Sequence, residues 1–225
     1  IGGFGLTGVI LDATLQLTEI SSSLLDVTVK RFRTLYESYE ILLEEKDNFD
    51  YFHSWCDLAN HEPRNERGFL YLARFSPIKT IPTKQVNSRD PIRSHFHVCP
   101  NIFGTSLIKH VNKLYFHKHS HTQSTVKTLG DFIFPSKNRL YYFSLFGPAG
   151  LFEHQVLIPH VSVREYLKRF NSLIKEKTPV ISLCHMKLFQ GEQRHLSFDG
   201  SGFCLAIHAP ANPRTFDFLQ ALDRM

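Results

Sequence analysis

Residues 152–159 read Phe152-Glu153-His154-Gln155-Val156-Leu157-Ile158-Pro159. This run of aromatic and branched side chains, ended by a proline, predicts a β-strand. Ser162-x-x-Glu165 follows, a capping box that predicts the start of a helix. The helix has one apolar side, made by Tyr166, Leu167, Phe170, Leu173 and Ile174. Two further strands are expected after it, at residues 180–189 and 202–208.

The rest of the chain predicts a similar mixture of elements. We expect strands at residues 6–20, 27–33, 51–58 and 68–75, and helices at residues 35–46, 101–115 and from Asn212-Pro213 onward. The stretches 61–67, 76–100 and 116–150 are expected to be loops. Two such long loops do not fit a repeated strand–helix–strand unit. The order favours an α+β fold, an antiparallel sheet with helices packed on one face.

The composition is that of an ordinary globular protein. Of the 225 residues, 42% are hydrophobic and 21% are charged, and the net charge is +5. No apolar run approaches the roughly 18 residues that cross a membrane. The cysteines Cys56, Cys99, Cys184 and Cys204 show no CxxC spacing. We therefore expect free thiols in a reducing, cytoplasmic setting.

Two clusters of residues suggest functions that we do not favour. His117, His119 and His121 alternate, as do His95 and His97 before Cys99, and three imidazoles on one strand face would suit a transition metal. No acidic residue or cysteine lies near residues 117–121, so solvated loop histidines are expected and no metal. Basic and aromatic residues interleave over residues 109–118, as in nucleic-acid binders. The other basic residues are dispersed, so no nucleic-acid partner is expected.

The chain opens with a glycine-rich segment, Ile1-Gly2-Gly3-Phe4-Gly5-Leu6-Thr7-Gly8. Glycines at this density allow a backbone to approach a flat or phosphorylated ligand closely, because no Cβ intervenes. A tight turn before a strand is the alternative. A chain that begins inside such a motif is expected to be a piece of a longer protein.

Several motifs resemble those of the FAD-linked oxidases of the vanillyl-alcohol oxidase superfamily, most closely the decaprenylphosphoryl-ribose oxidase branch. The motifs are Gly5-Leu6-Thr7-Gly8, Ser54-Trp55-Cys56-Asp57, Phe146-Gly147-Pro148-Ala149-Gly150, Leu183-Cys184-His185-Met186-Lys187-Leu188-Phe189 and Gly202-Phe203-Cys204. The resemblance covers residues 1–75 and about 130–225. It implies that residues 1–25 are the tail of an FAD-binding domain and residues 26–225 a truncated substrate domain.

The resemblance also implies roles for individual residues. FAD would lie beside Gly3, Gly5, Leu6, Thr7, Gly8 and Ile10. Gln155 matches a pocket glutamine of the family, whereas Glu153 stands where the family has a second glutamine. That departure disfavours a phosphate beside Glu153, because like charges repel.

The strand at residues 183–189 would supply the catalytic cation, Lys187, with His185 and Phe189 on the same face. A solvent-facing lysine on an edge strand is the alternative for Lys187. Cys204 matches a cysteine that lines the family's pocket, so an accessible thiol is expected there, with Cys56 less accessible. A plain buried thiol is the alternative. Trp55 would line the same cavity, or else belong to the core.

The function implied by the resemblance is oxidation of a CH–OH group of a sugar, polyol or lipid-linked sugar, by hydride transfer to FAD. Its partners would be that substrate and the FAD-binding domain of the same protein, with peripheral membrane contact if the substrate is lipid-linked. The chain alone is expected to be inactive. The alternative is a non-catalytic domain that binds a phosphorylated or lipid-linked ligand.

Overall fold

The computed structural model describes residues 5–59, 66–78, 104–119, 124–134, 141–192 and 198–225. Seven strands form one antiparallel sheet in the order β4-β1-β3-β2-β6-β7-β5. Their bounds are β1 Leu24–Phe32, β2 Tyr51–Asp57, β3 Arg67–Phe75, β4 Ser124–Thr128, β5 Leu151–Ile158, β6 Leu183–Phe189 and β7 Gly202–Pro210. The predicted α+β class and antiparallel sheet are confirmed.

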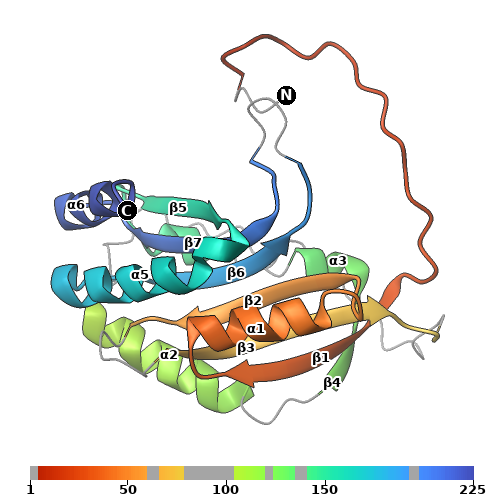
Figure 1. Ribbon diagram of the computed structural model, residues 1–225, viewed down its shortest axis with the longest axis horizontal. Coiled ribbons are helices and arrows are strands. Elements are labelled where there is room, and N and C mark those ends of the chain that lie inside the picture. Colours follow the sequence, from red (N-terminus) through yellow and green to blue (C-terminus); the bar gives the residue numbers. More distant parts are fainter. Residues whose placement is uncertain (1–4, 60–65, 79–103, 120–123, 135–140, 193–197) are drawn as a thin grey trace.

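The front face of the sheet is covered by three helices, α1 (Leu35–Glu45), α5 (Val163–Lys177) and α6 (Pro213–Leu222). Figure 1 shows α1 and α5 lying across this face. Alternate strand residues such as Leu70, Met186 and Phe203 pack against buried side chains of the three helices. The side α5 buries is the one predicted for it, with Leu167, Phe170 and Ile174. This cluster is the main core.

The back face is divided between two environments. Over β1 and β3 an aromatic cluster is completed by α2 (Thr105–His119) and α3 (Leu129–Ile133), so helices lie on both faces of the sheet and not on one face as expected. Phe69 stacks on Phe116 of α2, and Tyr51 lies against Phe132 of α3. Over β5, β6 and β7 this buried cluster does not continue among the described residues. We call the first region the covered half and the second the polar half.

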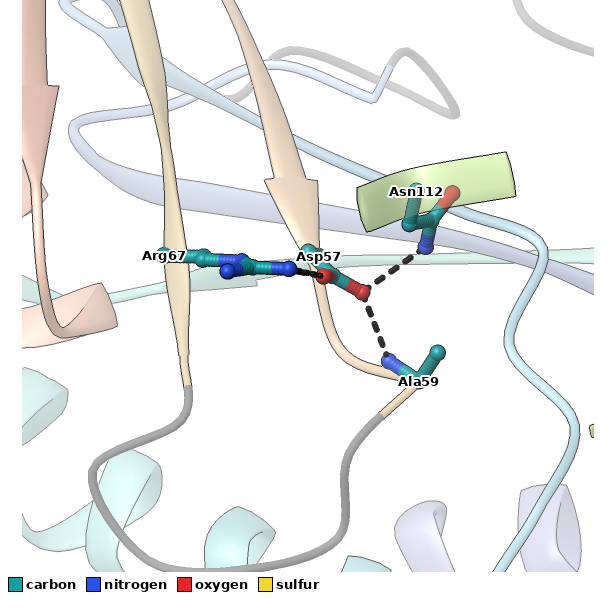
Figure 2. A network of polar contacts seen from close by, with 4 residues as sticks. All are labelled: Asp57, Ala59, Arg67 and Asn112. Atoms are coloured by element: carbon teal, nitrogen blue, oxygen red, sulfur yellow. Dashed lines mark hydrogen bonds and ion pairs between the residues drawn. The ribbon is translucent and has the colours of Figure 1, made fainter. Parts of the chain in front are cut away.

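A buried carboxylate anchors α2 on the covered half (Figure 2). Asp57, at the end of β2, is 2% exposed. It accepts hydrogen bonds from Nδ2 of Asn112 on α2 at 2.8 Å, from the Ala59 amide at 3.2 Å and from Nε and Nη2 of Arg67 on β3 at 3.2 Å. A buried charge is tolerated when it is paired and hydrogen-bonded in this way. One side chain thus joins β2, β3 and α2.

The sheet narrows to a seam between β2 and β6. The register pairs Cys56 with Cys184 there, whereas the neighbouring strands pair along most of their length. Ser54 reinforces the seam, because its hydroxyl donates to the Met186 carbonyl at 3.1 Å and accepts from the Met186 amide at 2.6 Å. The seam separates β4-β1-β3-β2 from β6-β7-β5.

Three local predictions differ from the structure. Residues 8–20 form an extended arm without strand pairing among the described residues (Figure 1), since a strand needs a neighbour for its ladder hydrogen bonds. The capping box does not form: Ser162 ends a short 3-10 turn, η1 (His160–Ser162), and makes no side-chain cap. The stretch expected to be irregular to residue 150 contains β4, α3 and α4 (Tyr141–Ser144).

The other elements agree with expectation to within a few residues. The last helix begins as predicted, because Oδ1 of Asn212 accepts from the Thr215 amide and Pro213 occupies its first turn. α2 begins at Thr105 and runs on to His119. The loop expected at 61–67 and the surface stretch at 76–100 lie largely outside the described residues, as do His95, His97, Cys99 and His121.

Candidate functional site

The polar half brings together most of the predicted pocket residues on one face. β7 lies between β5 and β6, and the register aligns their side chains in three rows. The rows are Glu153–His208–Leu183, Gln155–Ala206–His185 and Leu157–Cys204–Lys187, with Phe189 opposite Gly202 beyond them. Because strand side chains alternate, all these residues point to the back face. Their joint placement is the one that the sequence predicted; the roles of the residues stay predictions.

One end of the polar half is a hydrogen-bonded chain around His208. Nε2 of His208 lies 3.2 Å from Oε2 of Glu153, and Nδ1 lies 3.3 Å from the hydroxyl of Tyr142 on α4. The Tyr142 hydroxyl is also 2.9 Å from Oγ of Ser182. His208 is buried, whereas the Glu153 side chain is 51% exposed. This series of hydrogen bonds therefore leads from the half-buried phenol of Tyr142 to a carboxylate at the surface.

Burial controls the protonation states of His208 and Tyr142. It lowers the pKa of His208, an effect that the neighbouring Glu153 carboxylate opposes. It also raises the pKa of Tyr142 to about 12. At neutral pH, His208 is therefore a neutral imidazole and Tyr142 a phenol. Because a carboxylate oxygen can only accept, a neutral His208 carries its proton on Nε2 and donates it to Glu153, which leaves Nδ1 to accept from the Tyr142 hydroxyl.

The middle row carries a second neutral imidazole. Burial, with help from the charge of Lys187 and from His208, lowers the pKa of His185 to about 4. The His185 and His208 rings meet edge to face, with centroids 5.8 Å apart. His185 is thus a hydrogen-bonding group without charge at neutral pH.

Lys187 marks the opposite end from Glu153. It lies beside Cys204 in the register, and its side chain is partly buried. In the part of the chain that the structure describes, no hydrogen bond or ion pair engages its ammonium group. A partly buried cation in this position is available to a ligand oxygen.

Cys204 corrects one expectation about accessibility. Its exposed fraction is 0%, and that of Cys56 is 2%, so neither thiol is accessible. Leu157 lies beside Cys204 in the register, and Nε2 of Gln155 donates to its sulfur at 3.2 Å. Burial raises the pKa of the Cys204 thiol. The alternative of a plain buried thiol is the one that holds.

Trp55 lies on the same back face but in the covered half. Its ring packs on Phe69, with centroids 5.9 Å apart, and on Tyr115 of α2 at 4.6 Å. Trp55 is partly buried, so these contacts attach it to the aromatic cluster of the covered half, and its role in a pocket stays a prediction. The sequence could not place Trp55, because the position of α2 depends on contacts such as Asn112 with Asp57, far apart in the chain.

The glycine-rich segment lies on the extended arm, apart from the strands of the polar half (Figure 1). Gly5 has φ +80° and Gly8 has φ +153°, and no heavy atom lies within 4 Å of the place where a Cβ would stand. Leu6, Thr7 and Ile10 are exposed, and Gly3 is outside the described residues. The open backbone fits one wall of a cofactor site.

Two kinds of site are not seen in the described ranges. No group of three histidine, cysteine or acidic side chains is placed to hold a metal ion. His117 and His119 lie in α2, where a spacing of two puts side chains on different faces. No helix of these ranges is long and apolar enough to cross a bilayer.

Sequence reasoning missed His208 and Tyr142. His208 could have been found, because it continues the alternation of Cys204 and Ala206 along β7. Tyr142 could not, because the short helix α4 carries no periodic signal and its partner Ser182 is 40 residues away.

Comparison with known proteins agrees with the motifs. No family model matches the chain. A variant of berberine bridge enzyme, a reticuline dehydrogenase, matches 89% of this chain and 39% of its own at 9% identity, and its TM-score of 0.43 is too low to carry an argument. The chain is 24% identical over 234 residues to the decaprenylphosphoryl-beta-D-ribose oxidase of Mycolicibacterium smegmatis, covering 100% of this chain and 50% of that protein. It therefore spans about half the length of this relative, and its resemblance to that oxidase runs over the whole of the given sequence.

Proposed function

We propose that this chain forms the substrate-binding part of an FAD-dependent oxidoreductase that oxidises a CH–OH group of a sugar, polyol or lipid-linked sugar. The observation that carries the proposal is the polar half of the back face. There Glu153, Gln155, His185 and Lys187 share one surface, on a chain similar throughout to an oxidase. Polar groups converging on one face of a sheet are typical of a small-molecule site.

The cofactor would contact the arm. Gly3, Gly5, Leu6, Thr7, Gly8 and Ile10 would hold it, and the open backbone at Gly5 supports this assignment. When bound, FAD supplies a two-electron acceptor for the hydrogen that leaves the substrate carbon. Redox chemistry belongs to the cofactor, so the residues of this chain would bind and orient the alcohol.

Each polar residue would have a distinct task. The Lys187 ammonium would attract the substrate oxygen and stabilise negative charge that develops on it. His185, neutral at neutral pH, would exchange hydrogen bonds with a hydroxyl group without repelling Lys187. Gln155 is held by Cys204 and would present its carbonyl oxygen as an acceptor. Phe189 would supply an apolar wall beyond Lys187.

The arm supports a division of the chain into two parts. Residues 1–25 would belong to the FAD-binding domain of the same protein, and residues 26–225 to the substrate domain. Along the arm, the exposed apolar side chains include Val9, Leu11, Leu15 and Leu17. Apolar and polar residues alternate strictly over residues 11–18. That pattern suits a strand with one buried face. Its neighbour would be a sheet of the FAD-binding domain.

The test uses the full-length protein that carries this chain. Without oxygen, a sugar or polyol substrate should bleach the flavin absorbance, and the rate should saturate with substrate concentration. Replacement of the pocket lysine, Lys187→Ala, should slow this bleaching. Lys168→Ala, on an exposed turn of α5, is its matched control and should bleach normally. Absence of FAD from the purified protein would overturn the proposal, as would bleaching by none of a broad panel of alcohols.

A further inference from the structure

The polar half carries opposite charges at its two ends. Glu153 and His208 form one row, and Cys204 and Lys187 form another. The two rows lie four positions apart along β7, at His208 and Cys204, which corresponds to about 13 Å along the strand. A ligand group that lies at the Glu153 end therefore meets a different environment from one at the Lys187 end.

We propose that Glu153, held in place by His208 and Tyr142, determines specificity by accepting a hydrogen bond from an ammonium or hydroxyl group of the ligand and rejecting phosphate there. This inference rests on the proposed function in one respect, that the polar half binds the substrate. It assigns the ligand chemistry at one end of that site, and it gives His208 and Tyr142 positioning roles.

The first support is the partner of the carboxylate. A neutral His208 donates through Nε2 to one oxygen of Glu153, because a carboxylate oxygen can only accept, and Nδ1 faces the Tyr142 hydroxyl. His208 is buried and neutral at neutral pH, so it orients the carboxylate without cancelling its charge. The half-exposed Glu153 side chain keeps acceptor positions free for a ligand.

The second support is the surroundings of the carboxylate. His185 is the neighbouring basic side chain of β6 on this face, and its lowered pKa keeps it uncharged at neutral pH. Lys187 lies two residues further along β6. The described residues therefore place no full positive charge beside Glu153 that would let a phosphate approach. A ligand ammonium group would instead form a charge-assisted hydrogen bond there.

The test measures binding at His208 in this chain directly, without flavin. Imidazole ¹⁵N shifts of His208 would be followed on titration with D-glucosamine, D-glucose and D-glucose 6-phosphate. These probes share a ring, and glucosamine and the phosphate ester each differ from glucose in one substituent. We expect glucosamine to perturb His208 with an affinity about 10-fold tighter than that of the phosphate ester. Glu153→Gln should abolish this preference, whereas Glu165→Gln, on exposed α5, should keep it.

Each contrary result is informative. Equal or tighter binding of the phosphate ester at His208 would overturn the proposal, and so would a His208 signal that no probe changes. A preference for glucosamine that survives Glu153→Gln would overturn it too. If alcohols bleach the flavin of the full-length protein but no probe changes the ¹⁵N shifts of His208, the proposed function stands and this inference fails. If glucosamine is preferred at His208 but no alcohol bleaches the flavin, the binding site at Glu153 stands and the proposed oxidase function fails.

Discussion

The covered and polar halves of the back face belong to one sheet but carry different kinds of side chains. In the covered half, aromatic rings fill the space under α2 and α3, and the single buried carboxylate, Asp57, has its hydrogen bonds satisfied within the described residues. In the polar half, Lys187 is partly buried without an ion-pair partner among the described residues, and Glu153 is half exposed. Satisfied groups stabilise a fold, whereas groups left available are those that can serve a ligand.

Trp55 and Gln155 illustrate the difference. Both match pocket motifs in sequence, and both lie on the back face. Trp55 packs against Phe69 and Tyr115, so its substitution should chiefly affect stability. Among the described residues, the Gln155 side chain makes one hydrogen bond, to Cys204, and its carbonyl oxygen accepts none. A shared face is thus insufficient to define a site, because the helices packed above it decide which side chains remain available.

The largest expected effect is on stability, in the covered half. Asp57→Ala would leave the guanidinium of Arg67 and the amide of Asn112 without their partner. We expect a loss of about 3 to 5 kcal/mol in the free energy of unfolding, as for other broken buried pairs. Urea unfolding followed by circular dichroism measures it. Asp217→Ala, exposed on α6, should change stability by less than about 0.5 kcal/mol; a similar small loss for Asp57→Ala would contradict the anchoring of α2.

The next effect concerns activity and the polar half. In the full-length protein, Lys187→Ala should slow anaerobic flavin reduction about 10²-fold or more, because a desolvated charge on the substrate loses its counter-charge. FAD should remain bound, and stability should barely change. Lys187→Arg should restore little, since a planar guanidinium does not replace a compact ammonium group. Near-normal reduction by the alanine variant would place Lys187 in the solvent-facing role.

A third prediction concerns acid sensitivity of the covered half. His53 stacks on Tyr71 and lies against Phe132, its buried Nε2 has no hydrogen-bond partner among the described residues, and burial lowers its pKa to about 3. The unfolded chain takes up this proton near pH 6.5, so stability is lost as the pH falls from there towards 3. His53→Phe should remove about 2 kcal/mol of the stability loss between pH 7 and pH 5. Urea titrations at both pH values measure it, and an unchanged difference would contradict the burial of His53.

The smallest expected effect concerns the hydrogen bonds around His208. Tyr142→Phe removes the hydroxyl that contacts Ser182 and His208, at a cost of about 0.5 to 1.5 kcal/mol. The more specific readout is the imidazole ¹⁵N spectrum, in which His208 should change from one tautomer towards a mixture. Tyr36→Phe, a tyrosine of α1 on the front face, is the control and should leave the spectrum unchanged. A fixed tautomer in Tyr142→Phe would remove Tyr142 from the positioning role.

Period-two alternation explains why much of the polar half could be predicted. Once residues 183–189 and 202–208 are strands, Lys187 must share a face with His185, and Cys204 with His208. The sheet class also follows, because the order of strands and long connections excludes a simple parallel arrangement. These inferences need only neighbours in the chain.

Contacts between distant segments explain the failures. Whether Trp55 is a pocket or a core residue depends on where α2 lies, which is set by residues 55 positions apart, Asp57 and Asn112. The burial of Cys204 depends on Leu157 and Gln155 of another strand. The arm has the alternation of a strand but no paired neighbour in the described residues, and its sequence does not reveal what it pairs with.

The seam between β2 and β6 has a consequence for how the molecule opens. Separating the two groups of strands there breaks fewer backbone hydrogen bonds than a break elsewhere in the sheet, and a single serine hydroxyl spans much of the gap. Amide protons of Met186 should consequently exchange with deuterium by a local opening event, earlier than those in the middle of β3 or β7. Lys187 and His185 lie on the strand beside this opening. The region that would bind the substrate thus borders the least cooperative line of the sheet, and ligand binding should slow the exchange there first.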